Sequence, residues 1–342
     1  MINTLILKAY DIDKDFNNIK IAAEILKNSG LVAIPTETVY GLAANAFNDF
    51  AVSKIFKAKG RPQDNPLIVH IADISALSDL VTVTPPKAKL LADEFWPGPL
   101  TMIFKKKENI CRTVSAGLDT IAIRMPNNKI ATEIIKASGL PLAAPSANLS
   151  GSPSPTKSKH VVSDLFGKID AIIESDECNI GVESTVISMV SDLPKLLRPG
   201  GITKKQIESV IGPIDVDKSI TSKISDNESV SSPGMKYKHY SPKAQVIIVE
   251  GTLDKFNQYI RERYKEGIYA LCFDDDEVSV PHVSYGKSND DNMQAKRVFS
   301  ALRELDEVGA QQVYARCPTK HGVGLAVYNR LLRAADFEVI KL

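Results

Sequence analysis

A long stretch without apolar periodicity, residues 212–242, most constrains how this 342-residue chain can fold. On each side of it, short apolar runs alternate with segments whose apolar residues recur every three or four positions. That alternation is typical of strands followed by helices, and a chain of this length exceeds one ordinary core. The stretch itself is rich in Ser, Asp, Lys and Pro, as linkers are. We therefore predict two α/β domains, residues 1–211 and 243–342, joined by a linker at residues 212–242.

The first domain is predicted to contain a twisted sheet of parallel and antiparallel strands covered by helices. The spacing of apolar residues favours helices at residues 16–29, 51–59, 86–95, 129–138, 157–166 and 203–211, and Asp49 is the expected N-cap of the second. Short apolar runs predict strands at residues 31–35, 67–71, 100–104, 121–124, 142–145, 171–174 and 185–189.

The second domain is predicted to be a smaller, Rossmann-like α/β domain with a parallel sheet. Strands are expected at residues 245–249, 268–273, 312–315 and 338–340, and helices at residues 253–264, 289–307 and 324–334. Gly322 and Gly324 precede the last helix, but the third glycine of a GxGxxG dinucleotide motif is missing. These glycines therefore indicate close packing rather than a dinucleotide site.

Bulk properties exclude several classes of protein. The net charge is +1, so any site for a polyanion must come from local clustering of cations. The four cysteines lie far apart without metal-ligand spacing, which predicts a reduced protein without structural zinc. Neither a signal peptide nor an apolar run of about 18 residues is recognisable. We expect a cytoplasmic protein that does not enter a membrane.

Two short polar signatures are the strongest candidates for chemistry. Lys59 ends a predicted helix and Arg61 follows it, whereas Ser146 and Asn148 follow a predicted strand. In an extended backbone, side chains two residues apart point to the same face, so each pair could hold one ligand. Cations and neutral donors suit a polyanion such as a nucleoside triphosphate. The alternatives are a helix end decorated with dipole-compensating lysines and an ordinary polar turn.

Other polar residues follow or end predicted strands. The segment PTETVYGL, residues 35–42, is either a ligand-binding loop or a turn. Arg124 ends a buried strand and needs an anionic partner, either a substrate carboxylate or a structural acid. His70 lies between apolar residues, where a structural histidine is the alternative to a ligand-binding one. Because no GxxxxGK[ST], GxSxG or HExxH motif occurs, catalysis would rest on positioning and charge stabilisation.

Seven motifs, in this order and spacing, resemble those of the threonylcarbamoyl-AMP synthase (YrdC-like) family over roughly residues 10–211. They are PTETVYGL, KAKGRPQDNPLIVHI, WPGPLT, IAIRMP, PLAAPSANLSG, ESTVI and LRPGGIT. The linker end SPGMKYKHYSP and the second α/β domain resemble the longer, two-domain form of the family. The resemblance implies a YrdC-like catalytic domain followed by a linker and a C-terminal domain.

The resemblance also implies a reaction. L-threonine, bicarbonate and ATP would give L-threonylcarbamoyladenylate and pyrophosphate, and other proteins would use that product to modify the adenosine beside the anticodon of certain tRNAs. Mg²⁺ would arrive with ATP, because no carboxylate cluster for a metal is visible. The alternative is an RNA- or tRNA-binding protein that uses the basic stretch at residues 54–61, which the low net charge disfavours.

Site residues carry over by the same resemblance. Lys59, Arg61, Ser146 and Asn148 would form the catalytic signature, with Lys59 and Arg61 at the triphosphate. The nucleotide would also contact Gln63, Thr120, Ser146, Asn148, Ser154 and Arg198, and Tyr237 in the linker would close over it. Threonine would be held by Thr36, His70, Arg124, Ser184 and the backbone of Ala144. Because a mixed anhydride needs protection from water, residues 233–242 are a candidate lid.

Overall fold

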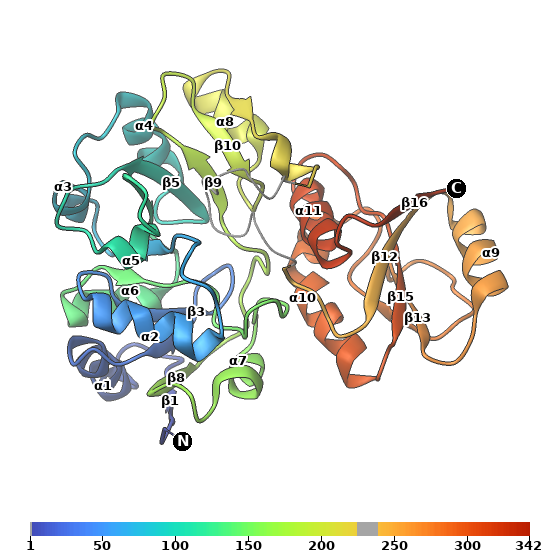
Figure 1. Cartoon of the computed structure of the whole chain (residues 1–342), viewed down its shortest axis with the longest axis horizontal. Helices are drawn as coiled ribbons and strands as arrows, with labels where there is room; N and C mark the ends of the chain where they lie inside the picture. The colour runs from blue at the N-terminus through green and yellow to red at the C-terminus, as the bar shows by residue number, and fades with distance from the viewer. Residues whose placement is uncertain (1, 224–238) are drawn as a thin grey trace.

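The computed structural model describes residues 2–223 and 239–342, which form two α/β domains lying side by side (Figure 1). Within these residues the first sheet has eleven strands and the second has five, so the predicted fold class is confirmed. The strands of the first sheet are β1 (Leu5–Lys8), β2 (Val32–Ile34), β3 (Gly41–Asn45), β4 (Ile68–His70), β5 (Leu100–Lys105), β6 (Thr120–Arg124), β7 (Leu142–Ala143), β8 (Ala171–Glu174), β9 (Thr185–Ser188), β10 (Lys195–Arg198) and β11 (Asp215–Val216).

Helices cover both faces of this sheet. They are α1 (Phe16–Lys27), α2 (Asp49–Lys59), α3 (Leu77–Leu80), α4 (Pro86–Phe95), α5 (Arg112–Ser115), α6 (Lys129–Ser138), α7 (Ser158–Leu165) and α8 (Lys204–Ile211), with 3-10 turns at Ile74–Ala76 and Lys218–Ile220. Alternate residues of a strand point to opposite faces. Val32 and Ile34 therefore pack towards α1 and α6, whereas Leu31 and Ala33 pack towards α2 and α7.

The first sheet is mixed, as predicted. Its strand order is β1-β8-β2-β3-β7-β4-β6-β5-β9-β10-β11. The β4–β6 and β5–β9 pairs are parallel, whereas the β4–β7, β5–β6 and β9–β10 pairs are antiparallel. This pattern brings the ends of β4 and β6 and the start of β9 to one region of the sheet, where the polar motifs follow or precede them.

Local differences from the sequence prediction have simple causes. The predicted N-cap Asp49 is wrong, because the Asn48 side chain accepts the Ala51 N–H and Asp49 is the first helical residue. Strand β3, with the sequence GLAAN, was not predicted, since Gly and Ala have low strand propensity. Strand β11 lies inside the segment expected as a linker, and Ile220 after it is buried in the core of the first domain.

The second domain has an all-parallel sheet, as predicted. It contains β12 (Gln245–Glu250), β13 (Ile268–Cys272), β14 (His282–Ser284), β15 (Gln312–Arg316) and β16 (Val339–Lys341), in the order β14-β13-β15-β12-β16. Its helices are α9 (Leu253–Arg263), α10 (Asp291–Glu307) and α11 (Gly324–Ala334). At the entry to α11, Asp291 accepts the Gly324 N–H and the Thr319 hydroxyl, so a carboxylate of the chain itself occupies the helix N-terminus.

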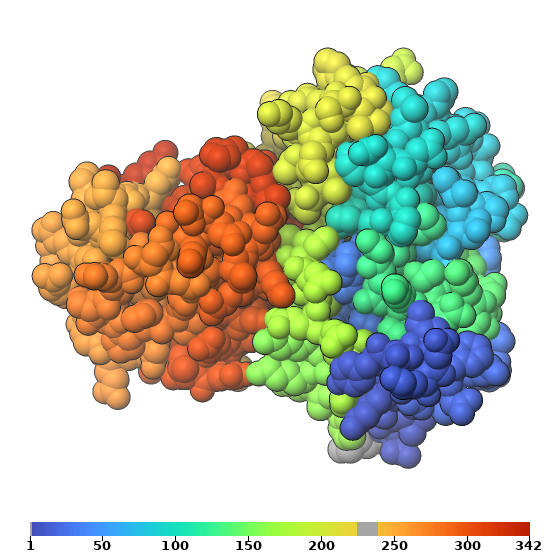
Figure 2. Space-filling model, turned by 180° about the vertical axis from the view of Figure 1, so that it is seen from behind, coloured from blue at the N-terminus to red at the C-terminus, as the bar shows by residue number. Residues whose placement is uncertain are grey.

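Helices α10 and α11 face the first domain (Figures 1 and 2). Gly181 makes the close approach possible, because a Cβ atom there would lie 2.3 Å from the Cα atom of Lys296 in α10. Arg303 of α10 forms an ion pair with Asp164 at 2.8 Å and donates to the Pro153 carbonyl. Helix α10 therefore contacts both helix α7 and loops of the first domain. Across residues 2–223 and 239–342, no helix combines the length and apolar character needed to cross a bilayer.

Stability should fall as the pH drops from about 6.5 towards 3. Of the five histidines in the chain, His70 and His160 are buried and His239 is half-buried, and loss of contact with water lowers the pKa of each to about 3. In that window the unfolded chain binds protons at these imidazoles and the folded protein does not. Stability must therefore rise with pH across it.

The variant His160→Gln tests this, because Gln keeps an acceptor for the Thr156 N–H. Urea unfolding at pH 7 and pH 5 should show that the variant loses less stability on acidification, by about 2 kcal/mol in total. His282→Gln, at an exposed position of β14, is the matched control and should behave like the unmodified chain. An unchanged pH dependence in His160→Gln would contradict the prediction.

Candidate active site

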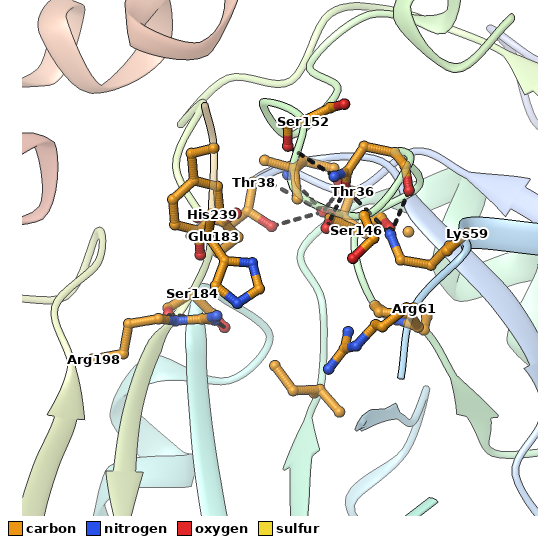
Figure 3. Close-up of a pocket in the computed structure, with 18 of the residues that line it drawn as sticks. Thr36, Thr38, Lys59, Arg61, Ser146, Ser152, Glu183, Ser184, Arg198 and His239 are labelled. Carbon is orange, nitrogen blue, oxygen red and sulfur yellow. Dashed lines mark hydrogen bonds between the residues drawn. The ribbon is translucent and has the colours of Figure 1, made fainter. Parts of the chain in front are cut away.

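Strand ends of the first sheet surround a cavity lined by buried polar side chains (Figure 3). Strands β4 and β6 end in register at His70 and Arg124, and Ser184 immediately precedes β9. Helix α2 ends at Lys59 on the opposite wall. The described lining residues are Thr36, Thr38, Val39, Gly41, Lys59, Arg61, Ile68, His70, Arg124, Ala144, Pro145, Ser146, Asn148, Ser150, Gly151, Ser152, Glu183, Ser184, Arg198, His239 and Tyr240.

The Lys59 ammonium is enclosed by the loop at residues 146–148. Its Nζ atom donates to the carbonyl oxygens of Ser146 at 2.5 Å and Asn148 at 2.6 Å, and it lies 3.3 Å from Asn148 Oδ1. Burial, together with the nearby Arg61 charge, lowers the pKa of Lys59 well below its usual range. Lys59 therefore fixes the shape of this loop as well as lining the cavity.

The loop is also held by its own side chains. Ser146 donates to Asn148 Oδ1 at 2.5 Å, and Asn148 Nδ2 donates to the carbonyls of Leu149 at 2.7 Å and Ser152 at 2.8 Å. Arg61 approaches from the wall of Lys59, with its Nη2 atom 3.1 Å from the Asn65 carbonyl (Figure 3). The two predicted signature pairs are thus in one place and linked through Lys59.

Arg124 has a structural acid as its partner. Its Nη2 atom lies 2.7 Å from Glu37 Oε2, and Nη1 donates to the Thr38 hydroxyl at 2.9 Å. Thr38 and Thr36 share a further hydrogen bond of 2.8 Å. Next to Arg124, His70 is buried, and its Nδ1 atom has no hydrogen-bond partner among the described residues. This side of the cavity therefore combines a cation, hydroxyls and a neutral imidazole with a free nitrogen.

Ser184 and Arg198 form the wall between these groups and the second domain. Arg198 donates to the Ser184 carbonyl from Nε at 3.1 Å and from Nη2 at 2.9 Å, and Nη2 also reaches the Ser184 hydroxyl at 3.1 Å. The same hydroxyl lies 2.7 Å from that of Thr101. Arg198 thus fixes both the backbone and the side chain of Ser184.

Known proteins are similar to this chain in both sequence and structure. The profile of the Sua5–YciO–YrdC family, described as "Telomere recombination", matches residues 24–200, and that of "Threonylcarbamoyl-AMP synthase, C-terminal domain" matches residues 202–336. Threonylcarbamoyl-AMP synthase of Bacillus subtilis is 50% identical over 327 residues, which cover 94% of this chain and 93% of that protein. The chain belongs to the threonylcarbamoyl-AMP synthase family.

Two further comparisons agree with this assignment. Threonylcarbamoyl-AMP synthase of Pyrococcus abyssi is 46% identical over 333 residues, covering 95% of this chain and 96% of that protein. The crystal structure of P. abyssi Sua5 complexed with L-threonine superposes with a TM-score of 0.93 at 42% identity, covering 99% of both chains. As a member of the threonylcarbamoyl-AMP synthase family, the chain is an enzyme of the nucleotidyltransferase type.

Most of the predicted site residues line this one cavity. Thr36, Lys59, Arg61, His70, Arg124, Ala144, Ser146, Asn148, Ser184 and Arg198 all line it. Gln63 is exposed, Thr120 lies at the opposite end of β6 from Arg124, and Ser154 is buried behind the wall. These three do not line the cavity here, and their contacts with a nucleotide stay predictions. Tyr237 and most of the candidate lid at residues 233–242 lie outside the described residues.

Sequence reasoning missed several lining or supporting residues. Thr38 of the PTETVYGL motif lines the cavity, and Glu37 of the same motif supports it as the partner of Arg124. Glu183 lines the cavity and could have been suspected from its place before Ser184. His239 and Tyr240 line it from the described end of the candidate lid at residues 233–242, which was predicted as a segment and not as individual site residues.

Protein ligands for a metal are scarce in this site. Within residues 2–223 and 239–342, no group of three or more His, Cys, Asp or Glu side chains could hold a metal ion. Among the described lining residues, Glu183 is the one carboxylate, and it already bonds Ser154 and Arg330. The described residues therefore do not form a metal site of their own.

Two adjacent glycines provide a matched test of this wall. A Cβ atom at Gly200 would lie 2.3 Å from the Thr185 backbone nitrogen and 2.7 Å from the Glu183 carbonyl oxygen, and backbone atoms cannot easily move. A Cβ atom at Gly201 would lie 3.3 Å or more from side-chain atoms of Ile180 and Pro99, which can yield. Gly200→Ala should therefore lower stability by about 1–3 kcal/mol, and Gly201→Ala by less than about 1 kcal/mol. Equal midpoints for the two variants in urea unfolding would contradict this.

Proposed function

We propose that the cavity synthesises L-threonylcarbamoyladenylate and pyrophosphate from L-threonine, bicarbonate or CO2, and ATP. The observation that carries the proposal is the charge of the lining. Lys59, Arg61, Arg124 and Arg198 face the cavity, whereas the carboxylates of Glu37 and Glu183 are each paired with an arginine. A buried cavity with excess positive charge favours binding of anions and stabilises negative charge that develops there.

The chemistry needs such a site because two anions must meet. The threonine amine forms an N–C bond with CO2 and loses a proton, which gives a carbamate. A carbamate oxygen then attacks the α-phosphorus of ATP, the bond from that phosphorus to the bridging oxygen breaks, and pyrophosphate leaves. Carbamate and triphosphate repel each other, so cations placed beforehand lower the barrier.

The nucleotide half of the site is proposed at Lys59, Arg61, Ser146, Asn148 and Arg198. Arg61 can meet phosphate oxygens with its planar fork of N–H donors. Lys59 holds the backbone of the 146–148 loop, so we assign it a second role in presenting that loop to the nucleotide. Phosphate nearby would also favour the protonated form of Lys59, against the effect of burial.

The threonine half is proposed at Thr36, His70, Arg124, Ser184 and the backbone of Ala144. Arg124 keeps N–H donors beyond those used by Glu37, Thr38 and the Gly98 carbonyl, and these can bind the substrate carboxylate. Buried polar atoms are normally hydrogen-bonded, so the free Nδ1 atom of His70 supports a polar ligand group beside it. That ligand group is proposed to be the hydroxyl or amine of threonine.

Mg²⁺ is proposed to enter as part of the ATP substrate. When bound to the phosphates it would neutralise part of their charge, and the described lining residues add no carboxylate cluster to hold it. The product would then pass to proteins that transfer the threonylcarbamoyl group to tRNA. We place this exchange in the cytoplasm, and direct contact of the chain with tRNA is a further proposal.

Release of pyrophosphate tests the proposed reaction. Release from ATP should require threonine and bicarbonate together, because the carbamate is the nucleophile. The measurement is a coupled pyrophosphate assay with each component omitted in turn. Release without threonine would contradict the carbamate route. Tight and salt-sensitive tRNA binding with no release would favour the RNA-binding alternative instead.

The cations of α2 and the following turn allow a matched comparison. Arg61→Ala should lower the turnover of adenylate formation about 10²–10³-fold, since it removes a contact to the charge that develops in the transition state. Lys59→Ala should lose at least as much, because the 146–148 loop also loses its anchor. Lys57→Ala removes an exposed cation of the same helix and should leave turnover within about twofold. Equal losses in all three variants would contradict a local role.

A further inference from the structure

A buried carboxylate lies in the wall of a cavity that is proposed to bind anions. Glu183 is 7% exposed and faces the cavity beside Ser184 (Figure 3). Burial alone would raise the pKa of Glu183, but Arg330 and Arg198 outweigh burial and lower it, so the side chain is charged. An unpaired negative charge here would repel ATP and the carbamate. The fold must therefore neutralise Glu183.

The cation that does so comes from the second domain. Arg330 of α11 is completely buried, and its Nε atom donates to Glu183 Oε2 at 2.6 Å. Its Nη2 atom reaches the Glu183 carbonyl at 3.3 Å, and Nη1 donates to Asn329 at 2.8 Å. The other Glu183 oxygen accepts the Ser154 hydroxyl at 2.5 Å. With both oxygens engaged, Glu183 is unsuited to accept a proton as a general base.

Other cations of the wall have different partners. Arg198 donates to Ser184, and Lys59 donates to the 146–148 loop. His239 and Tyr240 also face Glu183 from the linker end, without a positive charge at neutral pH because burial lowers the pKa of His239 to about 3. Arg330 thus supplies the ion pair that Glu183 makes in the described residues.

Arg330 also contacts a second lining residue. Its guanidinium lies 5.6 Å from the ring centre of Tyr240, which packs against Phe299 of α10 at 5.1 Å. Tyr240 has φ of 64°, a left-handed conformation that is unusual for a bulky residue and persists only where its surroundings hold it. The second domain therefore touches the cavity wall at two points through one arginine.

We propose that Arg330 is a positioning residue for adenylate synthesis. From the second domain it neutralises Glu183 and holds Glu183 and Tyr240 in the cavity wall, so the second domain completes a site built mainly by the first. Arg330 itself lies behind the wall and does not line the cavity. The inference rests on the proposed function for its activity readout.

A charge-removal cycle in the full chain tests the inference. Arg330→Met leaves Glu183 charged and unpaired, and it should lower kcat/KM for ATP about 10- to 100-fold. The double variant Glu183→Gln with Arg330→Met removes both charges and should recover most of that loss. A merely structural role of Arg330 would make the double variant as poor as Arg330→Met or worse, which would overturn the proposal, as would full activity of Arg330→Met.

Arg316→Met is the matched control. Arg316 forms a partly buried ion pair with Asp276 at 3.1 Å inside the second domain, so its loss affects that domain without changing the cavity wall. Arg316→Met should leave kcat/KM for ATP unchanged when all variants are assayed below the unfolding temperature of the least stable one. A loss as large as that of Arg330→Met would show a general effect of the second domain and would overturn the specific role.

Failure of a variant to fold and failure of the proposed reaction can each be distinguished from failure of the inference. If Arg330→Met does not fold, Arg330→Gln compared with Arg316→Gln decides, because Gln removes the charge but keeps a polar group. A loss of kcat/KM in the first alone supports the proposal, and equal values overturn it. If the unmodified chain releases no pyrophosphate, the proposed function fails, and ATP affinity by calorimetry then compares the same variants. Weaker ATP binding in Arg330→Met that the double variant restores would still support the inference.

Discussion

Basic side chains held out of water before any ligand arrives are the constraint on which the rest of the structure depends. Lys59, Arg124 and Arg198 are each at most 7% exposed, and Arg330 behind them is completely buried. Removing a cation from water costs several kcal/mol unless it is paired or hydrogen-bonded. The compensating groups are carbonyls, hydroxyls and two carboxylates, Glu37 and Glu183. Most of these groups lie in loops at strand ends, so the cations determine the shape of those loops.

This arrangement suits a reaction between two anions. In water, donors must reorient as negative charge develops, and the energy of reorientation adds to the barrier. In the cavity, Arg198 and Lys59 are already fixed by the Ser184 backbone and the 146–148 loop, so they need little rearrangement. The burial of these side chains strengthens each charge interaction, which makes an uncompensated carboxylate more harmful than it would be at the surface.

Much of the fold and a large part of the site could be predicted from the sequence. The alternation of apolar runs and helical spacing predicted both sheets, and the Lys59/Arg61 and Ser146/Asn148 signatures lie together as their shared chemistry suggested. Strands β1, β3, β10, β11 and β14 were not predicted. Strand β3 is rich in Gly and Ala, which have low strand propensity, and β11 has only two residues, whereas the apolar residues of β1 and β10 were a usable signal. The partner of Arg124 was left open between a substrate and an acid, because an ion pair between residues 87 positions apart depends on tertiary packing. Glu37 occupies that place.

The contribution of the second domain was the least predictable part, because it depends on contacts across the interface. Segment 178–184 explains why those contacts matter. Its backbone donates from Ile180 and Gly181 to the carbonyls of Glu37 and Thr38, so it supports the threonine side of the cavity. The same segment lies against α10 at Gly181 and against Arg330 at Glu183. A shift of the second domain would therefore move one wall of the cavity and leave Glu183 without its cation. The contact between the two domains and the neutralisation of Glu183 therefore depend on each other in this chain.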